Sequence, residues 1–184
     1  TTDQSAKDTA EGASTGLFDF HNTYAVTPVA SSVSDALSIS KELKNRQLRG
    51  GQFTFLLTDK QTGKTLQTVT NDAKGAVRFA AISYAKPGTY SYTVSEKIPE
   101  SAVKNAAGAY VYDDVTYDST VYDVTVTVSD NHDGTLTAAT TRTDSQGARM
   151  AGTTITFVNV APLPTPVLAD TGAAIPALLL AFMA

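Results

Sequence analysis

The stretch from Thr153 to Val160 alternates large apolar residues with smaller or polar ones, with a period of two. This period is typical of a β-strand, in which successive side chains point to opposite faces. Ile155, Phe157 and Asn159 therefore share one face, which we expect to be buried. A buried carboxamide without a partner costs on the order of 1–3 kcal/mol. The strand therefore predicts another polar group inside the fold that meets Asn159.

Two further strand-like stretches carry a polar residue in phase with apolar ones. Lys41 alternates with Leu37, Ile39 and Leu43, and Glu96 alternates with Tyr90, Tyr92, Val94 and Ile98. Each residue alone has an ordinary explanation, because lysines reach the rim of a sheet, glutamates end strands and asparagines form turns. Three such residues on three core faces predict a buried cluster of Lys41, Glu96 and Asn159.

These three side chains have complementary chemistry when they are buried together. Burial lowers the pKa of a lysine and populates the neutral, nucleophilic amine, and it raises the pKa of a glutamate so that the acid is protonated. The acid would polarise the Asn159 carbonyl and pass a proton to the leaving ammonia. The expected product is a Lys41–Asn159 isopeptide bond, formed once without turnover. The chain is therefore not expected to be an enzyme.

Short strands separated by turn signals, without a convincing helix, predict an all-β fold of the β-sandwich type. The expected strands after the first are 53–57, 66–70, 76–79, 90–98, 117–129, 135–143 and 153–160. The polar connection 99–110 is expected to be irregular, with room for one helical turn.

The chain contains an internal repeat of a strand end. Residues 17–29 and 156–167 both read apolar, x, Phe, x, Asn, followed by an exit into Thr-Pro-Val. The simplest explanation is that Asn22 is the counterpart of Asn159 in a preceding domain, and the alternative is a coincidence between two strands. We therefore divide the chain into the end of a preceding repeat with a linker (1–33), the isopeptide-linked sandwich (34–160) and a tail (161–184).

The tail has three parts: a proline-rich spacer at 161–167, the pentapeptide 168–172 and an apolar run at 173–184. The run is shorter than the roughly 20 residues that span a bilayer. It is either a truncated membrane segment or a core helix, and its position after a proline spacer favours truncation.

The composition excludes several classes of site. Without cysteine the chain has no disulfide, thiolate nucleophile or cysteine-ligated metal. A net charge of −4 gives no reason to expect a nucleic-acid partner. His21 and His132 do not form a catalytic pair, and the turn 129–134 resembles a calcium loop that lacks the acidic residue at its twelfth position, Thr140. We expect no metal and no cofactor.

Five stretches of the chain resemble the streptococcal-type pilin isopeptide-linkage domain, a variant of the CnaB-like Ig fold. They are residues 37–57, 71–79, 88–96, 115–128 and 155–159. In that family a first-strand lysine bonds to a last-strand asparagine, and an acidic residue of a central strand assists. The resemblance implies the same roles for Lys41, Asn159 and Glu96.

The pentapeptide Leu168, Ala169, Asp170, Thr171 and Gly172 resembles the sortase sorting signal Leu-Pro-x-Thr-Gly, with alanine in place of proline. The resemblance implies that a sortase cuts after Thr171 and joins it to an amine of peptidoglycan or of another pilin subunit. We therefore expect a secreted, cell-wall-anchored stalk of a pilus or fibrous surface protein of a Gram-positive bacterium. The alternative is an adhesin domain that binds a host protein or glycan.

Overall fold

The computed structural model describes residues 24–143 and 148–164. Its elements, in chain order, are β1 (Val29–Ser31), α2 (Val33–Ala36), β2 (Ser38–Lys44), β3 (Thr54–Asp59), β4 (Thr65–Thr70), β5 (Ile82–Tyr84), β6 (Gly88–Glu96), β7 (Val103–Lys104), β8 (Tyr110–Tyr112), β9 (Val115–Thr116), β10 (Val121–Asp130), β11 (Leu136–Thr143) and β12 (Thr154–Val160). Among these described residues, no helix has the length and apolar character needed to cross a lipid bilayer.

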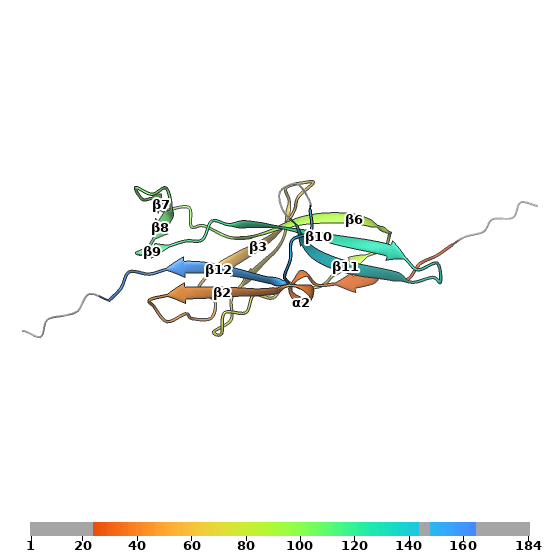
Figure 1. Cartoon of the computed structure of the whole chain (residues 1–184), viewed down its shortest axis with the longest axis horizontal. Coiled ribbons are helices and arrows are strands. Elements are labelled where there is room, and N and C mark those ends of the chain that lie inside the picture. Colours follow the sequence, from red (N-terminus) through yellow and green to blue (C-terminus); the bar gives the residue numbers. More distant parts are fainter. Residues whose placement is uncertain (1–23, 144–147, 165–184) are drawn as a thin grey trace, which may run out of the picture.

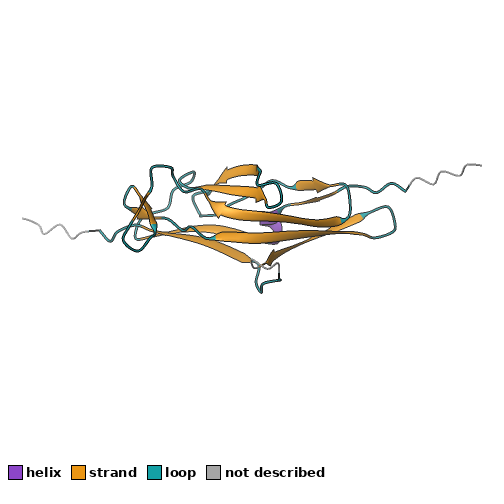
Figure 2. Cartoon of the chain, turned by 90° about the horizontal axis from the view of Figure 1, so that it is seen from above, coloured by secondary structure: helices purple, strands orange, loops and turns teal. Residues whose placement is uncertain are grey.

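The strands form two five-stranded sheets and a small two-stranded one. The orders are β11-β10-β6-β3-β4, β2-β12-β9-β8-β7 and β1-β5. The prediction of an all-β, two-sheet sandwich is confirmed. The body is elongated, and the described chain enters at one end of its long axis and leaves at the other (Figure 1, Figure 2).

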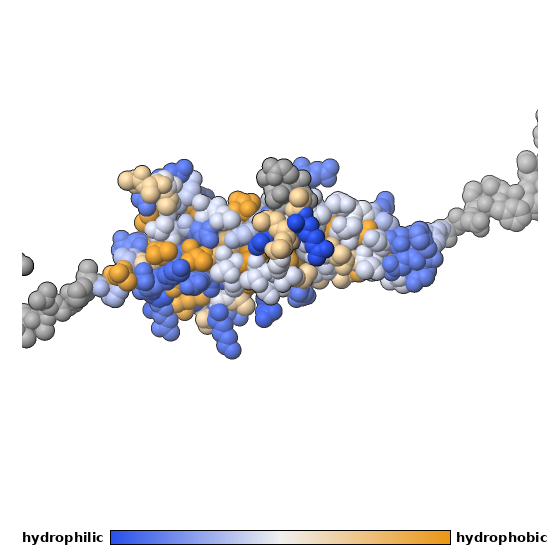
Figure 3. Space-filling model, in the orientation of Figure 1, coloured by the Kyte–Doolittle hydropathy of each residue, from blue (hydrophilic) through white to orange (hydrophobic). Residues whose placement is uncertain are grey.

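The core lies between the two large sheets, where the alternating side chains of facing strands meet. Phe55 of β3 and Phe157 of β12 are fully buried, with ring centroids 5.2 Å apart. The Tyr122 ring packs edge-on against Phe157 at 5.1 Å. Burying each such side chain contributes roughly 1.5–3 kcal/mol. The outer surface shown in Figure 3 is mostly polar, with apolar side chains gathered toward the end where β12 leaves.

Three predicted elements differ from the structure. The strand expected at 76–79 is reduced to two isolated bridges, because Asp72 accepts hydrogen bonds from Lys74 and Ala76 and holds this segment in a turn. The connection 99–110 contains β7 and the start of β8, without a helical turn. The strand expected from Tyr117 begins only at Val121.

The folded body begins earlier than residue 34, where the sequence placed the domain boundary. β1 pairs with β5, an element that the sequence did not predict, and Val33 is only 2% exposed. The Thr27 N–H donates to the Gly134 carbonyl at 2.8 Å, and the Tyr24 hydroxyl donates to Asp130 Oδ1 at 2.8 Å. Residues 24–33 therefore pack on the sandwich rather than forming a free linker. Asn22 lies outside the described residues.

The turn beside β2 requires a glycine at position 75. The Lys41 N–H donates to the Gly75 carbonyl at 2.7 Å. Gly75 has a φ of +89°, and a β-carbon there would collide with the Lys41 carbonyl oxygen. Gly75 therefore lets this turn approach the backbone of the strand that carries Lys41.

We expect Gly75→Ala to lower the free energy of unfolding by more than about 2 kcal/mol, because the left-handed backbone alone costs roughly 1–2 kcal/mol and the collision adds to it. Gly63→Ala is the matched control, since Gly63 has a φ of +69° and open space around its β-carbon position. Urea unfolding measures both variants. Equal losses would show that the close approach at Gly75 is unimportant.

Candidate functional site

The three polar residues singled out by the strand period all point into the core. Lys41 lies at the middle of β2, Glu96 ends β6, and Asn159 lies near the end of β12. Their exposed fractions are 4%, 5% and 0%. Each belongs to a strand whose neighbours in phase are buried, so the local sequence places these side chains inside.

The strand register brings the three side chains together. β2 and β12 pair in parallel, with Phe157 opposite Lys41 and Asn159 opposite Leu43. Lys41 and Asn159 are therefore diagonal neighbours on the core side of one sheet. Glu96 comes from the facing sheet, where it pairs with Phe55.

Glu96 bridges the other two side chains. Lys41 Nζ donates to Glu96 Oε2 at 2.7 Å, and Asn159 Nδ2 donates to Glu96 Oε1 at 2.6 Å. One carboxyl group thus contacts the amine nitrogen through one oxygen and the carboxamide nitrogen through the other.

The Asn159 carbonyl oxygen has a different partner from the one that the sequence predicted. The Asp118 backbone N–H donates to Asn159 Oδ1 at 2.7 Å. A backbone N–H can only donate, so this contact defines which end of the carboxamide is the oxygen. The prediction that Glu96 donates to the carbonyl is therefore wrong for this geometry, because Glu96 contacts the amide nitrogen.

Sequence analysis did not identify Asp118. Its signal is the polar run Asp118-Ser119-Thr120, where the alternation of the predicted strand stops. An Asp side chain that accepts a hydrogen bond from the backbone N–H two residues later forms a known turn pattern, and the Thr120 N–H donates to Asp118 Oδ1 at 2.9 Å. This turn delays β10 and frees the Asp118 N–H for Asn159.

An aromatic ring packs against the amine. Lys41 Nζ lies 4.6 Å from the centroid of the Phe53 ring, which meets the Tyr117 ring edge-on at 5.6 Å. The side chains of Lys41 and Glu96 have no exposed surface. The pair therefore sits in a dry, apolar surrounding where charge is costly.

Burial shifts both titrating groups toward their neutral forms. It lowers the pKa of Lys41, against the opposing effects of Glu96 and Asp118. It raises the pKa of Glu96, against the opposing effects of Lys41 and Asn159. An uncharged amine next to a protonated acid is the combination that nucleophilic attack on a carboxamide needs.

The other candidates lie apart from this cluster. In the turn after β10, Asp130 and Asp133 accept hydrogen bonds from His132 and Thr135, as in a plain turn. In the described part of the chain, no group of three or more acidic, histidine or cysteine side chains could hold a metal ion. The sorting-signal residues Leu168, Ala169, Asp170, Thr171 and Gly172 lie outside the described residues.

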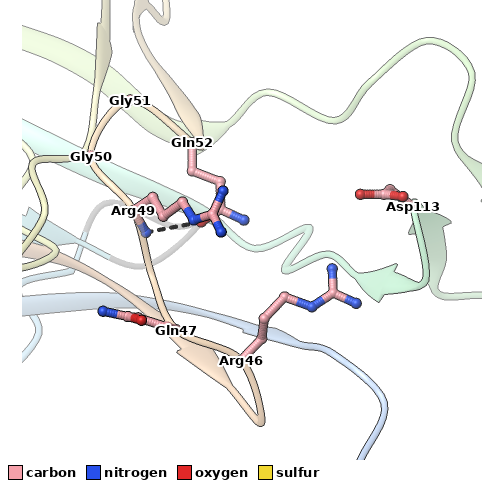
Figure 4. Close-up of a pocket in the computed structure, with 7 residues that line it drawn as sticks. All are labelled: Arg46, Gln47, Arg49, Gly50, Gly51, Gln52 and Asp113. Carbon is pink, nitrogen blue, oxygen red and sulfur yellow. Dashed lines mark hydrogen bonds between the residues drawn. The ribbon is translucent and has the colours of Figure 1, made fainter. Parts of the chain in front are cut away.

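A surface hollow of about 430 Å³ lies between the loop after β2 and the turn after β8 (Figure 4). It is lined by Arg46, Gln47, Arg49, Gly50, Gly51, Gln52 and Asp113. Small-molecule sites are usually lined by apolar and aromatic side chains, whereas this lining is polar or glycine.

The variant Asn159→Ala should reveal the two pKa shifts through stability. Between pH 4.5 and the raised pKa of Glu96 the folded state binds more protons than the unfolded state, so the free energy of unfolding should fall as the pH rises. Between the lowered pKa of Lys41 and pH 10.5 the unfolded state binds more protons than the folded state. The free energy of unfolding should therefore rise with pH in this range.

Urea unfolding over a pH series measures these slopes, each at most about 1.4 kcal/mol per pH unit. Adding Lys41→Met and Glu96→Gln to the same variant should remove both slopes. If each slope had the sign opposite to the one expected here, Lys41 and Glu96 would not be a neutral pair.

Comparison with known proteins identifies the family of the chain. The chain is similar to a glutamate-to-alanine mutant of the major pilin from Streptococcus pyogenes, with 18% identity and a TM-score of 0.39, over 74% of this chain and 51% of that pilin. The similarity thus spans about half the length of the pilin. A comparison with curated proteins finds no significant match. The family model for the Spy0128-like isopeptide containing domain matches residues 37–161, more than half of the chain, and the chain therefore belongs to that family.

Proposed function

We propose that Lys41 and Asn159 form an intramolecular isopeptide bond with the help of Glu96. The observation that carries this proposal is the bridging carboxyl group, which places one oxygen on each nitrogen that must exchange a proton. The neutral amine attacks Cγ of Asn159 and forms the new C–N bond. Glu96 accepts one proton from Nζ through Oε2 and gives one to Nδ2 through Oε1. Ammonia leaves, and the acid is regenerated.

The bond would join β2 and β12, the first and last strands of the sheet β2-β12-β9-β8-β7 in chain order. β2 and β12 are neighbours in that sheet and run in the same direction. Because they are parallel, force applied at the two ends of the body would shear them along their length. A covalent link between them would bear this force in place of the hydrogen bonds that pair the two strands. It would also close a loop of about 118 residues, which contributes roughly 5 kcal/mol in the entropic treatment of cross-links.

We propose that the chain serves as a stalk in a pilus or fibrous protein on the surface of a Gram-positive bacterium. The family membership, the elongated body with its ends at opposite poles and the cysteine-free composition support this role. The tail would supply the attachment, with a sortase cutting after Thr171 and joining it to peptidoglycan or to a neighbouring subunit.

Intact mass spectrometry tests the bond. The chain should have a mass about 17 Da below that of its sequence, the mass of one ammonia lost on amide formation. Lys41→Ala, Asn159→Ala and Glu96→Ala should retain the full mass. Lys44→Ala is the matched control, because Lys44 lies on the same strand but on its exposed face, and it should still lose ammonia. A wild-type chain of full mass would refute the proposal.

Sortase treatment tests the attachment. Incubation with a cell-wall sortase and a glycine-based amine should yield a product that ends at Thr171 joined to the amine. The same reaction with Leu168→Ala should be strongly slowed, because the signal begins at that residue. Cleavage elsewhere, or equal reaction of both chains, would argue against a sorting signal at 168–172.

A further inference from the structure

The carbonyl oxygen of Asn159 is the atom on which negative charge develops when Lys41 attacks. In acyl transfer, a donor already aimed at this oxygen stabilises the tetrahedral intermediate. The Asp118 N–H lies 2.7 Å from Oδ1, within the range expected of such a donor. This contact is separate from Glu96, which holds the two nitrogens.

The Asp118 carboxylate holds that N–H in place from two sides. Its Oδ2 accepts the N–H of Val158 at 2.9 Å, and Val158 is the residue immediately before Asn159. Its Oδ1 accepts the N–H of Thr120 at 2.9 Å. The side chain thus ties its own turn to the strand that carries the reacting carboxamide.

The charge of Asp118 does not help the amine. Its negative charge raises the pKa of Lys41 and so favours the unreactive ammonium. Burial raises the pKa of Asp118, but its hydrogen bonds with Thr120 and Val158 outweigh this, and the net pKa is lowered. The residue therefore remains ionised at neutral pH, and its benefit to the reaction must come through geometry.

We propose that the Asp118 backbone N–H is the oxyanion donor for isopeptide formation, and that the Asp118 carboxylate positions this N–H against Asn159. The inference rests on the proposed bond between Lys41 and Asn159. In the step, Nζ bonds to Cγ, the carbonyl electron pair moves to Oδ1 under the Asp118 N–H, and it returns as the bond from Cγ to Nδ2 breaks. The donor keeps its proton throughout.

Replacing the peptide N–H of residue 118 with an ester oxygen tests the donor directly. The full chain is made by semisynthesis with the hydroxy acid analogue of aspartate at 118, is refolded from denaturant, and its mass is followed over time. Loss of one oxyanion donor should slow the release of ammonia by on the order of 10²-fold or more. The matched control is an ester at Ser119, whose N–H makes no hydrogen bond in the described part of the chain. That ester should react at the wild-type rate.

Side-chain variants test the positioning role. Asp118→Ala removes both side-chain oxygens that accept the backbone N–H groups of Thr120 and Val158, and it should react more slowly than Asp118→Asn, which retains one acceptor oxygen. The same substitutions in a Lys41→Ala chain, which cannot react, measure any loss of fold stability separately. In that chain, labelling the Asn159 side-chain carbonyl with carbon-13 gives an infrared band. The ester at 118 should shift this band to higher frequency, because the carbonyl loses its donor.

The outcomes are distinguishable. A wild-type chain that never loses ammonia overturns the bond and this inference together. A wild-type chain that bonds while the ester at 118 bonds within about threefold of its rate overturns the role of Asp118 alone, since a missing oxyanion donor should cost far more. An unshifted carbonyl band in the ester chain would likewise overturn it.

Discussion

One carboxyl group in a dry core organises the site. Glu96 is the only one of the three clustered residues that comes from the opposite sheet, and it contacts both of the others. Removing it would leave a buried amine and a carboxamide nitrogen without their partner, at a cost of about 1–3 kcal/mol for each unsatisfied group. The sheets must therefore pack at a separation that suits this bridge. The Phe53 ring, whose centroid lies 4.6 Å from Lys41 Nζ, closes one side of the space around it.

A second buried asparagine shows why Glu96 matters. Asn71 is 2% exposed, yet its Oδ1 accepts the Phe53 N–H and its Nδ2 donates to the carbonyls of Arg49 and Asp72. Its neighbours are neutral backbone groups that neither attack a carbonyl nor transfer a proton. Asn159 is buried to the same degree but faces a carboxyl group and an amine. Burial alone thus makes an asparagine structural, and the titrating partners make it reactive.

The strand period predicted Lys41, Glu96 and Asn159 because each lies within a regular strand, where every second side chain faces the core. The same rule could not find Asp118, which lies where the ladder is interrupted and acts through its backbone N–H. It also failed at residues 76–79, which the Asp72 side chain holds in a turn, and at β1, whose pairing depends on the distant β5. Sequence alone gives the face of a side chain, whereas the direction of the Asn159 carboxamide follows from a contact 41 residues away.

The arrangement suits the product as well as the reactants. A secondary amide between Lys41 and Asn159 has one N–H and one carbonyl oxygen to satisfy. Glu96 already accepts from Nζ, and the Asp118 N–H already donates to Oδ1, so both partners are in place before the bond forms. The reaction removes a buried amine that favours charge in water and expels the amide nitrogen as ammonia. Because neither partner has to move, the core can stay close-packed throughout, and preorganisation of this kind lowers the barrier without any reorganisation of solvent.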